Sequence, residues 1–481
     1  VVVTNPPYMG SSGMGSKLAD YVKKNYPETK SDMFACFIEK GFSMAKRTGF
    51  ISMITMESWM FLSSFEKMRQ SIVTNKTIVN MVHMPYLGKG GTSLGINFGT
   101  AAVVFNNKKI SNYAAQYDYV CYYETDDNGI PFEFPVINER YKTATTENFK
   151  KIPGAPIAYW VSERMLGAYK KGTLLGDCSD VKIGMGTGKN DLFVREWWEI
   201  KHCLIDFSLK SINDIESSNG QYFPYNKGGE FRLWYGNLQE VLWFDKDGRK
   251  LMDTMSGHRE NGGHDFYCKA GLTWSFVSSS KFGIRFMPSG CFFDVAGSTL
   301  FSKVDNFYTL GFLASTVCFS ILSILNPTLN YQAGNIKSLP LISNNIEQVD
   351  ALVQNNIDTS KTDWDSFETS WDFEKHPLIR ESTVQRAFAA WEQECNDRFD
   401  TLKANEEELN RIFIDIYGLQ DELTPEVADK DVTVRLADKT GDIKSLISYA
   451  VGCMFGRYSL DAAGLAYAGG DWDAGKYTSF L

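Results

Sequence analysis

Four residues near the start of the chain, Asn5-Pro6-Pro7-Tyr8, combine a side-chain amide, two rigid rings and a phenol. Three valines precede them, which is typical of a buried strand, and the two prolines end that strand in a stiff turn. Such a turn places one amide oxygen and one backbone carbonyl at the carboxyl edge of a sheet, where open α/β sheets bind their ligands. Two fixed acceptors suit an exocyclic amino group, and the Tyr8 ring can stack on a flat base. The arrangement can orient an amine toward an electrophile by proximity and electrostatics. An ordinary strand-ending turn is the alternative.

The elements that would position this turn alternate along residues 1–125. Apolar spacing predicts two helices and, after the opening strand, three further strands: helices at Asp32–Lys46 and Trp59–Ile72, strands at Phe50–Thr55, Thr77–Met84 and Thr100–Phe105. This alternation of strands and helices is typical of a doubly wound sheet. Because no helix separates the last two strands, we expect them to form an antiparallel hairpin at the sheet edge.

The order of these motifs resembles the amino-group DNA methyltransferases that modify adenine at N6. The residues that carry this resemblance are TNPPY and the following DMFACFIEKGFSMAKRTGFISMITMESWMF. In addition, the segments NPPYMGSSGM, SDMFACFIEKG and INERYKT are similar in sequence to the large methyltransferase of BREX phage-defence systems. The resemblance implies an α/β fold in which the chain supplies the second half of a doubly wound, S-adenosyl-L-methionine-dependent methyltransferase sheet. It implies a site-specific enzyme that methylates a flipped adenine in double-stranded DNA, in phage defence or restriction-modification.

The same resemblance implies roles for individual residues. Asn5 and Pro6 would accept from the adenine amino group, while Pro7 and Tyr8 would shape and stack the base pocket. Asn5, Asp32 and Phe34 would line the cofactor side, although Asp32 also fits the N-cap of a helix. Phe98, just before the strand TAAVVF, is the candidate for a second aromatic wall against the base, and an ordinary core phenylalanine is the alternative.

The glycine-rich cofactor turn of this family lies upstream of the Asn-Pro-Pro-Tyr motif. We therefore expect the chain to begin inside the catalytic domain and to be inactive, or nearly so, by itself. The alternative function is a truncated, catalytically inactive protein that recognises DNA or joins a defence complex. Gly184, Gly186 and Gly188 offer a glycine turn for a circularly permuted enzyme, but the strand before them is short and no helix pattern follows.

The chain is predicted to have three parts: 1–150, the end of the catalytic domain; 151–345, an α+β target-recognition domain; and 346–481, an acidic and mainly helical region. Two segments resemble the first and last segments of target-recognition domains: VKIGMGTGKND at 181–191 and LNPTLNYQAGNIKSLP at 325–340. Gly188 would let a loop approach the duplex, Lys189 would meet a phosphate and Asn190 a base edge; a plain surface turn is the alternative. Six basic residues among aromatics are further candidates to line the duplex: Arg195, Lys201, Arg232, Arg259, Lys281 and Arg285.

The charge of the chain is divided unevenly. Residues 1–150 and 151–345 carry small positive balances, whereas residues 346–481 hold the whole acidic surplus of a chain with a net charge of −9. The acidic region is therefore expected to pack on the recognition domain or bind partner proteins rather than phosphates. Within it, residues 384–417 have the spacing of a long amphipathic helix.

The nine cysteines include no CxxC pair, so we expect no metal site, no disulfide framework and a reducing cytoplasm. One apolar stretch, 307–325, has the length of a membrane span. Its polar interruptions and the Asn326-Pro327 that follows favour a buried core helix.

Overall fold

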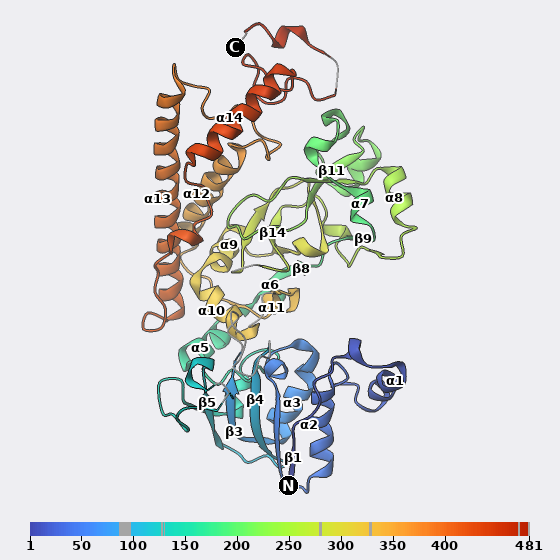
Figure 1. Ribbon diagram of the computed structural model, residues 1–481, viewed down its shortest axis with the longest axis vertical. Helices are drawn as coiled ribbons and strands as arrows, with labels where there is room; N and C mark the ends of the chain where they lie inside the picture. Colours follow the sequence, from blue (N-terminus) through green and yellow to red (C-terminus); the bar gives the residue numbers. More distant parts are fainter. Residues whose placement is uncertain are drawn as a thin grey trace. The chain divides into compact units, whose positions relative to one another are not determined.

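A computed structural model describes residues 1–85, 98–126, 128, 130–278, 281–326, 330–469 and 472–479 (Figure 1). The chain divides into two compact units. The first is Val1–Lys171 with a short stretch that begins at Ser323, and the second is Gly172–Leu322 with the C-terminal remainder of the chain. The division into 1–150, 151–345 and 346–481 stays a prediction.

The first unit is built on a six-stranded mixed sheet in the order β1-β2-β4-β3-β5-β6. Its strands are β1 Val2–Thr4, β2 Phe50–Met56, β3 Thr77–Met84, β4 Thr100–Asn106, β5 Ala114–Tyr119 and β6 Lys142–Thr145. β1 is parallel to β2 and β3 is parallel to β5, whereas β4 runs antiparallel to both of its neighbours. The expected antiparallel pairing of β3 and β4 is present, but its expected place at the sheet edge is wrong, because β4 is inserted between β2 and β3.

The core of the first unit lies on one face of this sheet. Ile51 and Met53 of β2 belong to the same buried cluster as Phe34 and Ile38 of α2 (Met33–Met44). α3 (Glu66–Asn75) contributes Met68 and Ile72. The remaining helices of this unit are α1 Ser16–Asn25, α4 Thr146–Phe149 and α5 Glu163–Lys171.

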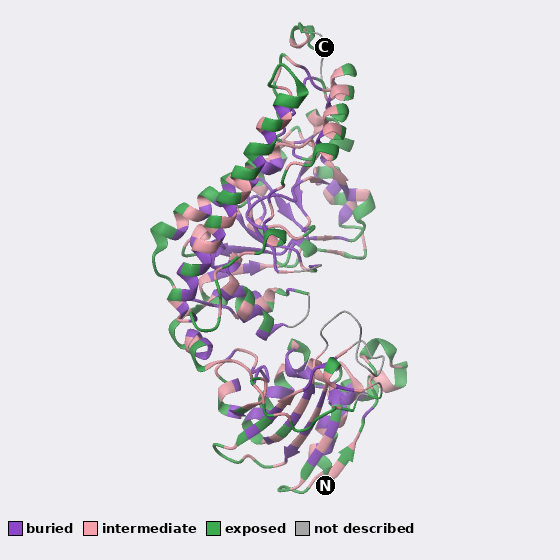
Figure 2. Cartoon of the chain, turned by 60° about the vertical axis from the view of Figure 1, so that its left-hand side comes forward, coloured by how far each residue is buried: buried purple, intermediate pink, exposed green. Residues whose placement is uncertain are grey.

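Residues of β1 and β2 that alternate with these core positions belong to the other face of the sheet, and they are exposed or half-buried, as the colours of Figure 2 show. Val3 is 73% exposed, Phe50 43% and Ile54 47%. The β1 side of the sheet therefore has an apolar second face that the described residues leave open to solvent.

The second unit contains two four-stranded sheets, in the orders β10-β12-β11-β16 and β15-β14-β17-β8, and the two-stranded pairs β13-β9 and β18-β7. Its strands are β7 Thr173–Leu174, β8 Ser179–Lys182, β9 Gly186–Thr187, β10 Val194–Glu196, β11 Tyr222–Asn226, β12 Glu240–Trp243, β13 His258–Arg259, β14 Gly271–Trp274, β15 Ile284–Met287, β16 Phe292–Phe293, β17 Thr299–Ser302 and β18 Pro340–Leu341. Its helices are α6 Leu175–Cys178, α7 Asn190–Phe193, α8 Lys246–Met252, α9 Asn306–Ala314, α10 Thr316–Leu325 (whose last residues fall in the first unit), α11 Ala333–Lys337, α12 Ile346–Asp365, α13 Val384–Tyr417 and α14 Lys439–Met454.

The long helix expected over 384–417 is present as α13, with those bounds. The Thr383 hydroxyl caps its N-terminus by accepting from the Arg386 N–H, and Gly418 ends it with φ of 69°. Its apolar stripe, which includes Leu402, Leu409 and Phe413, is buried. Local capping and a helical apolar period therefore define this element.

The apolar stretch 307–325 folds as two helices, α9 and α10, with an angle of 70° between them. In the part of the chain that the structure describes, no single helix is long and apolar enough to cross a membrane; only this bent pair, taken together, passes on length and composition. Side chains of both helices, such as Phe312 and Ile321, are buried in the protein.

Candidate active site and recognition residues

The Asn-Pro-Pro-Tyr turn follows β1 directly, because β1 ends at Thr4. Pro6 is buried, whereas Asn5 and Pro7 are exposed and Tyr8 is half-buried. The Tyr8 hydroxyl lies 3.0 Å from the Asn5 Oδ1 atom and 3.1 Å from the Ile54 carbonyl oxygen of β2. Burial raises the pKa of Tyr8, which keeps the hydroxyl a neutral donor. The Tyr8 hydroxyl thus holds the amide oxygen of Asn5 at the end of β1.

Two phenylalanines surround the Tyr8 ring. The Phe98 ring is 5.4 Å from it at an interplanar angle of 87°, and the Phe34 ring is 6.3 Å away at 79°. The structure therefore brings the Tyr8 and Phe98 rings together, in edge-to-face contact. The role of Phe98 as a second wall against a base stays a prediction.

Asp32 and Phe34 lie at the start of α2. Asp32 is the N-cap, and its Oδ1 atom accepts from the Phe34 N–H at 3.3 Å and from the Met9 N–H at 3.0 Å. This carboxylate therefore fastens the residue after Tyr8 to the helix. Phe34 is fully buried, beneath Tyr8 and against Phe65. The direct contact of both residues with a cofactor stays a prediction.

A polar cluster that the sequence motifs do not reveal lies at the carboxyl ends of β2 and β3, the same end of the sheet as the Asn-Pro-Pro-Tyr turn. Glu57 follows β2, and its Oε2 atom lies 2.7 Å from His83 Nε2 on β3. The other ring nitrogen of His83 lies 3.0 Å from the Tyr159 hydroxyl. A histidine near the end of the mainly apolar strand TIVNMVHM is the only signal for this cluster in the sequence.

The three predicted recognition residues occupy a tight turn after β9. Gly188 has φ of 80°, and a Cβ atom there would lie 2.8 Å from Met255 Cβ and 2.9 Å from the His258 backbone nitrogen. Asn190 Oδ1 accepts from the Thr187 hydroxyl at 2.6 Å. Lys189 is exposed. The glycine is required by the close approach of 255–258, so a turn-forming role accounts for it without DNA.

The six basic candidates do not form one surface. Arg285 of β15 is completely buried, which lowers its pKa to about 10. Arg232 is paired with Asp363 at 2.5 Å, and Lys281 with Asp431 at 2.6 Å. The expectation that Arg285 lines a duplex is wrong, because strand packing buries it completely. Arg232 and Lys281 are paired with carboxylates of the acidic region, and their contact with a duplex stays a prediction. Arg259 and Lys201 are exposed, and Arg195 is half-buried.

The acidic C-terminal region packs on the segment 231–235 of the same unit. Asp363 of α12 is fully buried and accepts from Arg232 and from the Arg435 backbone N–H, the latter at 3.0 Å. Glu406 of α13 accepts from Trp234 Nε1 at 2.7 Å. The sequence offered two roles for the acidic region: packing against the preceding part of the chain, or binding partner proteins. Within this unit the structure shows such packing, on residues 231–235.

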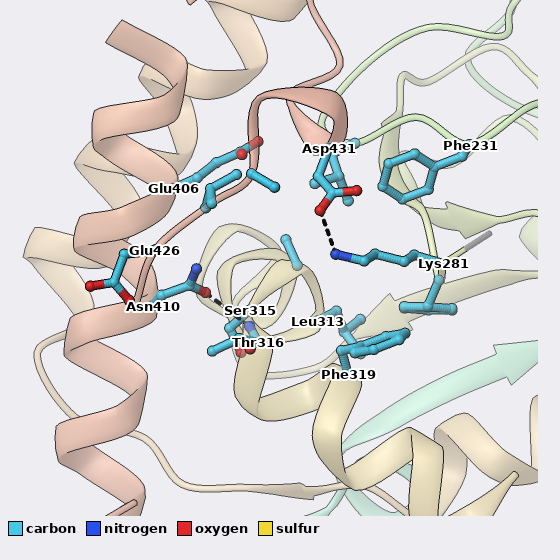
Figure 3. Close-up of a pocket in the computed structure, with 15 residues that line it drawn as sticks. Phe231, Lys281, Leu313, Ser315, Thr316, Phe319, Glu406, Asn410, Glu426 and Asp431 are labelled. Atoms are coloured by element: carbon cyan, nitrogen blue, oxygen red, sulfur yellow. Dashed lines mark hydrogen bonds and ion pairs between the residues drawn. The ribbon is translucent and has the colours of Figure 1, made fainter. Parts of the chain in front are cut away.

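A cavity of about 110 Å³ lies beside this contact, between α13, the α9–α10 junction and the Lys281–Asp431 pair (Figure 3). Burial raises the pKa of Glu406, which lines the cavity, to about 8, so this carboxyl is largely protonated at neutral pH. Asn410 accepts from the Thr316 N–H at 2.9 Å across the same space. The cavity belongs to the second unit, whereas the Asn-Pro-Pro-Tyr turn belongs to the first.

Comparisons with known proteins agree with the motifs at the start of the chain. A family model described as Eco57I restriction-modification methylase matches residues 1–88. The adenine-specific methyltransferase PglX of Lacticaseibacillus casei (strain Zhang) is 42% identical, over 100% of this chain and 41% of that protein. The adenine-specific methyltransferase BrxX of Escherichia coli O9:H4 (strain HS) is 34% identical, over 97% of this chain and 39% of that protein. The chain thus spans about two fifths of the length of these relatives.

The solved structure of the type IIL restriction-modification enzyme MmeI in complex with DNA superimposes with a TM-score of 0.51 and 12% sequence identity. The superposition covers 93% of this chain and 57% of that chain. At this identity the likeness concerns the fold, which is a mixed α/β fold of the kind found in restriction-modification enzymes. The resemblance read from the sequence motifs is confirmed: the chain is homologous along its whole length to the adenine-specific methyltransferases PglX and BrxX.

Proposed function

We propose that this chain is part of a site-specific DNA adenine-N6 methyltransferase. The observation that carries the proposal is the Asn-Pro-Pro-Tyr turn at the carboxyl end of β1, in which Tyr8 holds the Asn5 amide oxygen at 3.0 Å. Homology to two proteins named as adenine-specific methyltransferases supports it. Both relatives carry that name, so the alternative of a recognition protein without methyl transfer is not favoured.

In this proposal the turn binds the amino group of a flipped adenine. The Asn5 amide oxygen has two lone pairs and can accept from the adenine amine while it also accepts from Tyr8. Pro6 offers its backbone carbonyl as the second acceptor, and Pro7 keeps the turn stiff. Tyr8 and Phe98 enclose the base after one ring turns parallel to the other and the two rings, now 5.4 Å apart, separate to admit it. The acceptors orient the amine lone pair and stabilise the positive charge that develops on nitrogen.

S-adenosyl-L-methionine is the methyl donor implied by the homologues. Of the three residues expected on its side, Asn5 alone is exposed; the Asp32 Oδ1 atom is occupied by two backbone N–H groups, and Phe34 is buried. These residues do not fit a complete binding site for the donor. We assign Asp32 and Phe34 an indirect role, in which they hold Met9 and Tyr8 beside that side of the turn.

The sheet of the first unit would be the second half of a doubly wound catalytic sheet, as 1–150 was expected to be. Two observations support this: β1 and β2 are parallel, and the exposed Val3, Phe50 and Ile54 leave an apolar face that a doubly wound sheet covers with helices.

Residues 151–345 would recognise double-stranded DNA. The acidic region 346–481 would pack on this recognition domain without contacting the DNA. The fold likeness to an enzyme solved in complex with DNA is consistent with this role. Lys189 is exposed and has no ion-pair partner in the described part of the chain, so it can meet a phosphate. The Asn190 amide N–H groups donate to no other described residue, and in this proposal they meet a base edge. The match to a restriction-modification methylase family supports a role in restriction-modification or phage defence, and we propose other defence proteins as partners.

The test is methylation of DNA by the full-length protein with radiolabelled S-adenosyl-L-methionine, followed by digestion to nucleosides. We expect N6-methyladenine in the wild-type reaction and a strong loss with Asn5→Ala. N4-methylcytosine as the product, or transfer that survives Asn5→Ala, would contradict the proposal.

A further inference from the structure

Glu57, His83 and Tyr159 form a hydrogen-bonded chain at the edge of the sheet that carries the Asn-Pro-Pro-Tyr turn. β1, β2 and β3 end at this edge and β4 begins there, as the pairing of Thr100 with both Met56 and Met84 shows. The Glu57 carboxylate is 2.7 Å from His83, and His83 is 3.0 Å from the Tyr159 hydroxyl. The side chain of His83 is only 2% exposed. A buried polar chain of this kind is maintained only when each member has its partner.

Three aromatic rings from two separate segments, β5 and the adjacent residues 159–160, pack around His83. The Trp160 ring stacks on it at 6.1 Å and 21°, and Tyr119 and Tyr159 pack against it edge to face. Burial raises the pKa of Tyr159, so its hydroxyl stays protonated and can donate to Nδ1. In the neutral imidazole, Nε2–H then donates to the Glu57 carboxylate. Ring packing and hydrogen bonds together give the carboxylate one orientation.

Glu57 contacts the segment just before β4 that also contains Phe98. The Glu57 N–H donates to the Gly99 carbonyl at 2.9 Å. A Cβ atom on Gly99 would lie 2.2 Å from the Glu57 carboxyl group, so the carboxylate fills the space beside that glycine. The neighbouring Phe98 ring is 5.4 Å from Tyr8. Contacts therefore run without interruption from the buried histidine to the proposed base pocket.

We propose that Glu57 and His83 are positioning residues that set the aromatic wall of the adenine pocket through Gly99. This inference rests on the proposed function. Neither residue touches the base; they hold the Phe98 backbone where its ring can turn to stack on a flipped adenine. A displacement of about 1 Å can lower a rate by about 10²-fold. A shift of Phe98 should therefore lower kcat and weaken the stacking of the flipped base.

The experiment compares variants of the full-length protein. His83→Ala removes both hydrogen bonds, and Glu57→Gln removes the charge on the carboxylate. Tyr159→Phe removes the bond to His83, and Tyr117→Phe is its matched control. The Tyr117 ring stacks on Tyr159 at 4.4 Å, but its buried hydroxyl has no partner among the described residues. Thus both tyrosine variants lose one hydroxyl from the same aromatic stack, and only one of them loses a bond of the chain.

The readouts are kcat for methylation, the dissociation constant for DNA, and the fluorescence of 2-aminopurine placed at the target adenine. We expect His83→Ala to lower kcat about 10- to 100-fold and to alter the 2-aminopurine signal, with the DNA dissociation constant unchanged within about threefold. Tyr159→Phe should lower kcat several-fold and Tyr117→Phe should equal the wild type. If His83→Ala does not fold, the tyrosine pair decides.

Wild-type kcat and fluorescence in His83→Ala, Glu57→Gln and Tyr159→Phe would overturn the inference while the proposed function stands. Equal losses in kcat, DNA affinity and thermal stability would also overturn it, because they would show a purely structural role. Absence of methylation by the wild-type protein would overturn the proposed function, and this inference with it.

Discussion

The Tyr8 hydroxyl lies 3.0 Å from the Asn5 amide oxygen, so the first and last residues of the Asn-Pro-Pro-Tyr turn act as one hydrogen-bonded unit. The same hydroxyl lies 3.1 Å from the Ile54 carbonyl, which ties the turn to the neighbouring strand β2. The orientation of the amide that would meet the amine therefore depends on β2 as well as on β1.

Asn5→Ala removes the acceptor and leaves both prolines to hold the turn. The Asn5 oxygen interacts more strongly as positive charge develops on the amine, so the loss should fall on kcat, on the order of 10²-fold or more. DNA affinity, which we assign to 151–345, should be retained. Steady-state methylation and a DNA-binding titration on the full-length variant check both parts; a kcat within a few-fold of the wild type would show that Asn5 has another role.

Tyr8→Phe keeps the stacking ring and removes the hydroxyl that holds Asn5. One hydrogen bond contributes about 0.5–1.5 kcal/mol, so we expect kcat to fall roughly 3- to 10-fold, less than in Asn5→Ala. The double variant should be no worse than Asn5→Ala, because the hydroxyl acts through the amide. Additive losses in the double variant would separate the two residues.

Gly188→Ala should destabilise the second unit. The residue has φ of 80°, and the added Cβ would lie 2.8 Å from Met255 Cβ. A left-handed conformation alone costs a non-glycine residue about 1–2 kcal/mol. Gly334→Ala in α11 is the control, since a Cβ there meets nothing within 4 Å and helix propensity favours alanine. Denaturant unfolding of both variants measures the difference, and equal free energies of unfolding would contradict the prediction.

Asp363→Ala should lower the free energy of unfolding by about 3–5 kcal/mol, because it leaves Arg232 without its buried partner. The Asp363 side chain is 0% exposed and that of Arg232 only 12%. Glu408→Ala breaks the exposed ion pair with Arg411, whose side chain is 55% exposed, and should change the free energy by less than about 1 kcal/mol. Similar losses in the two variants would mean that burial does not distinguish these pairs.

Glu406 should make the protein less stable as the pH rises. Burial raises its pKa to about 8, above the ordinary value of 4.5, so between these values the folded state holds a proton that the unfolded state has lost. The stability contributed by this group is complete below about pH 4.5 and is lost by about pH 8, on the order of a few kcal/mol in total. The neighbouring Lys281, Glu407 and Asp431 act on the same carboxyl.

Glu406→Gln keeps an acceptor for Trp234 but does not titrate. The difference in free energy of unfolding between the wild type and this variant should therefore change with pH from 5 to 8, in favour of the variant at the higher pH. Chemical denaturation at several pH values measures it, and a constant difference would rule out Glu406 as the titrating group.

Much of the fold follows from local sequence rules. Backbone preferences and apolar periods act over a few neighbouring positions. They account for the end of β1 at Thr4, just before Asn5-Pro6-Pro7, and for the helical spacing of 384–417 with its caps at Thr383 and Gly418. The motif Asn5–Tyr8 could be found for the same reason, because its chemistry is contiguous. Asp32 was likewise readable as an N-cap.

Other features were decided only when distant segments packed together. β4 takes a place between β2 and β3, Glu57 meets His83, and Trp234 meets Glu406 from 172 residues away. Arg285 looked like a candidate for DNA contact in the sequence, but β15 carries it into the interior. Sequence spacing specifies which face of an element is apolar; it does not specify which other element covers that face. The partners of buried polar groups depend on that choice, and so only the tertiary structure settles them.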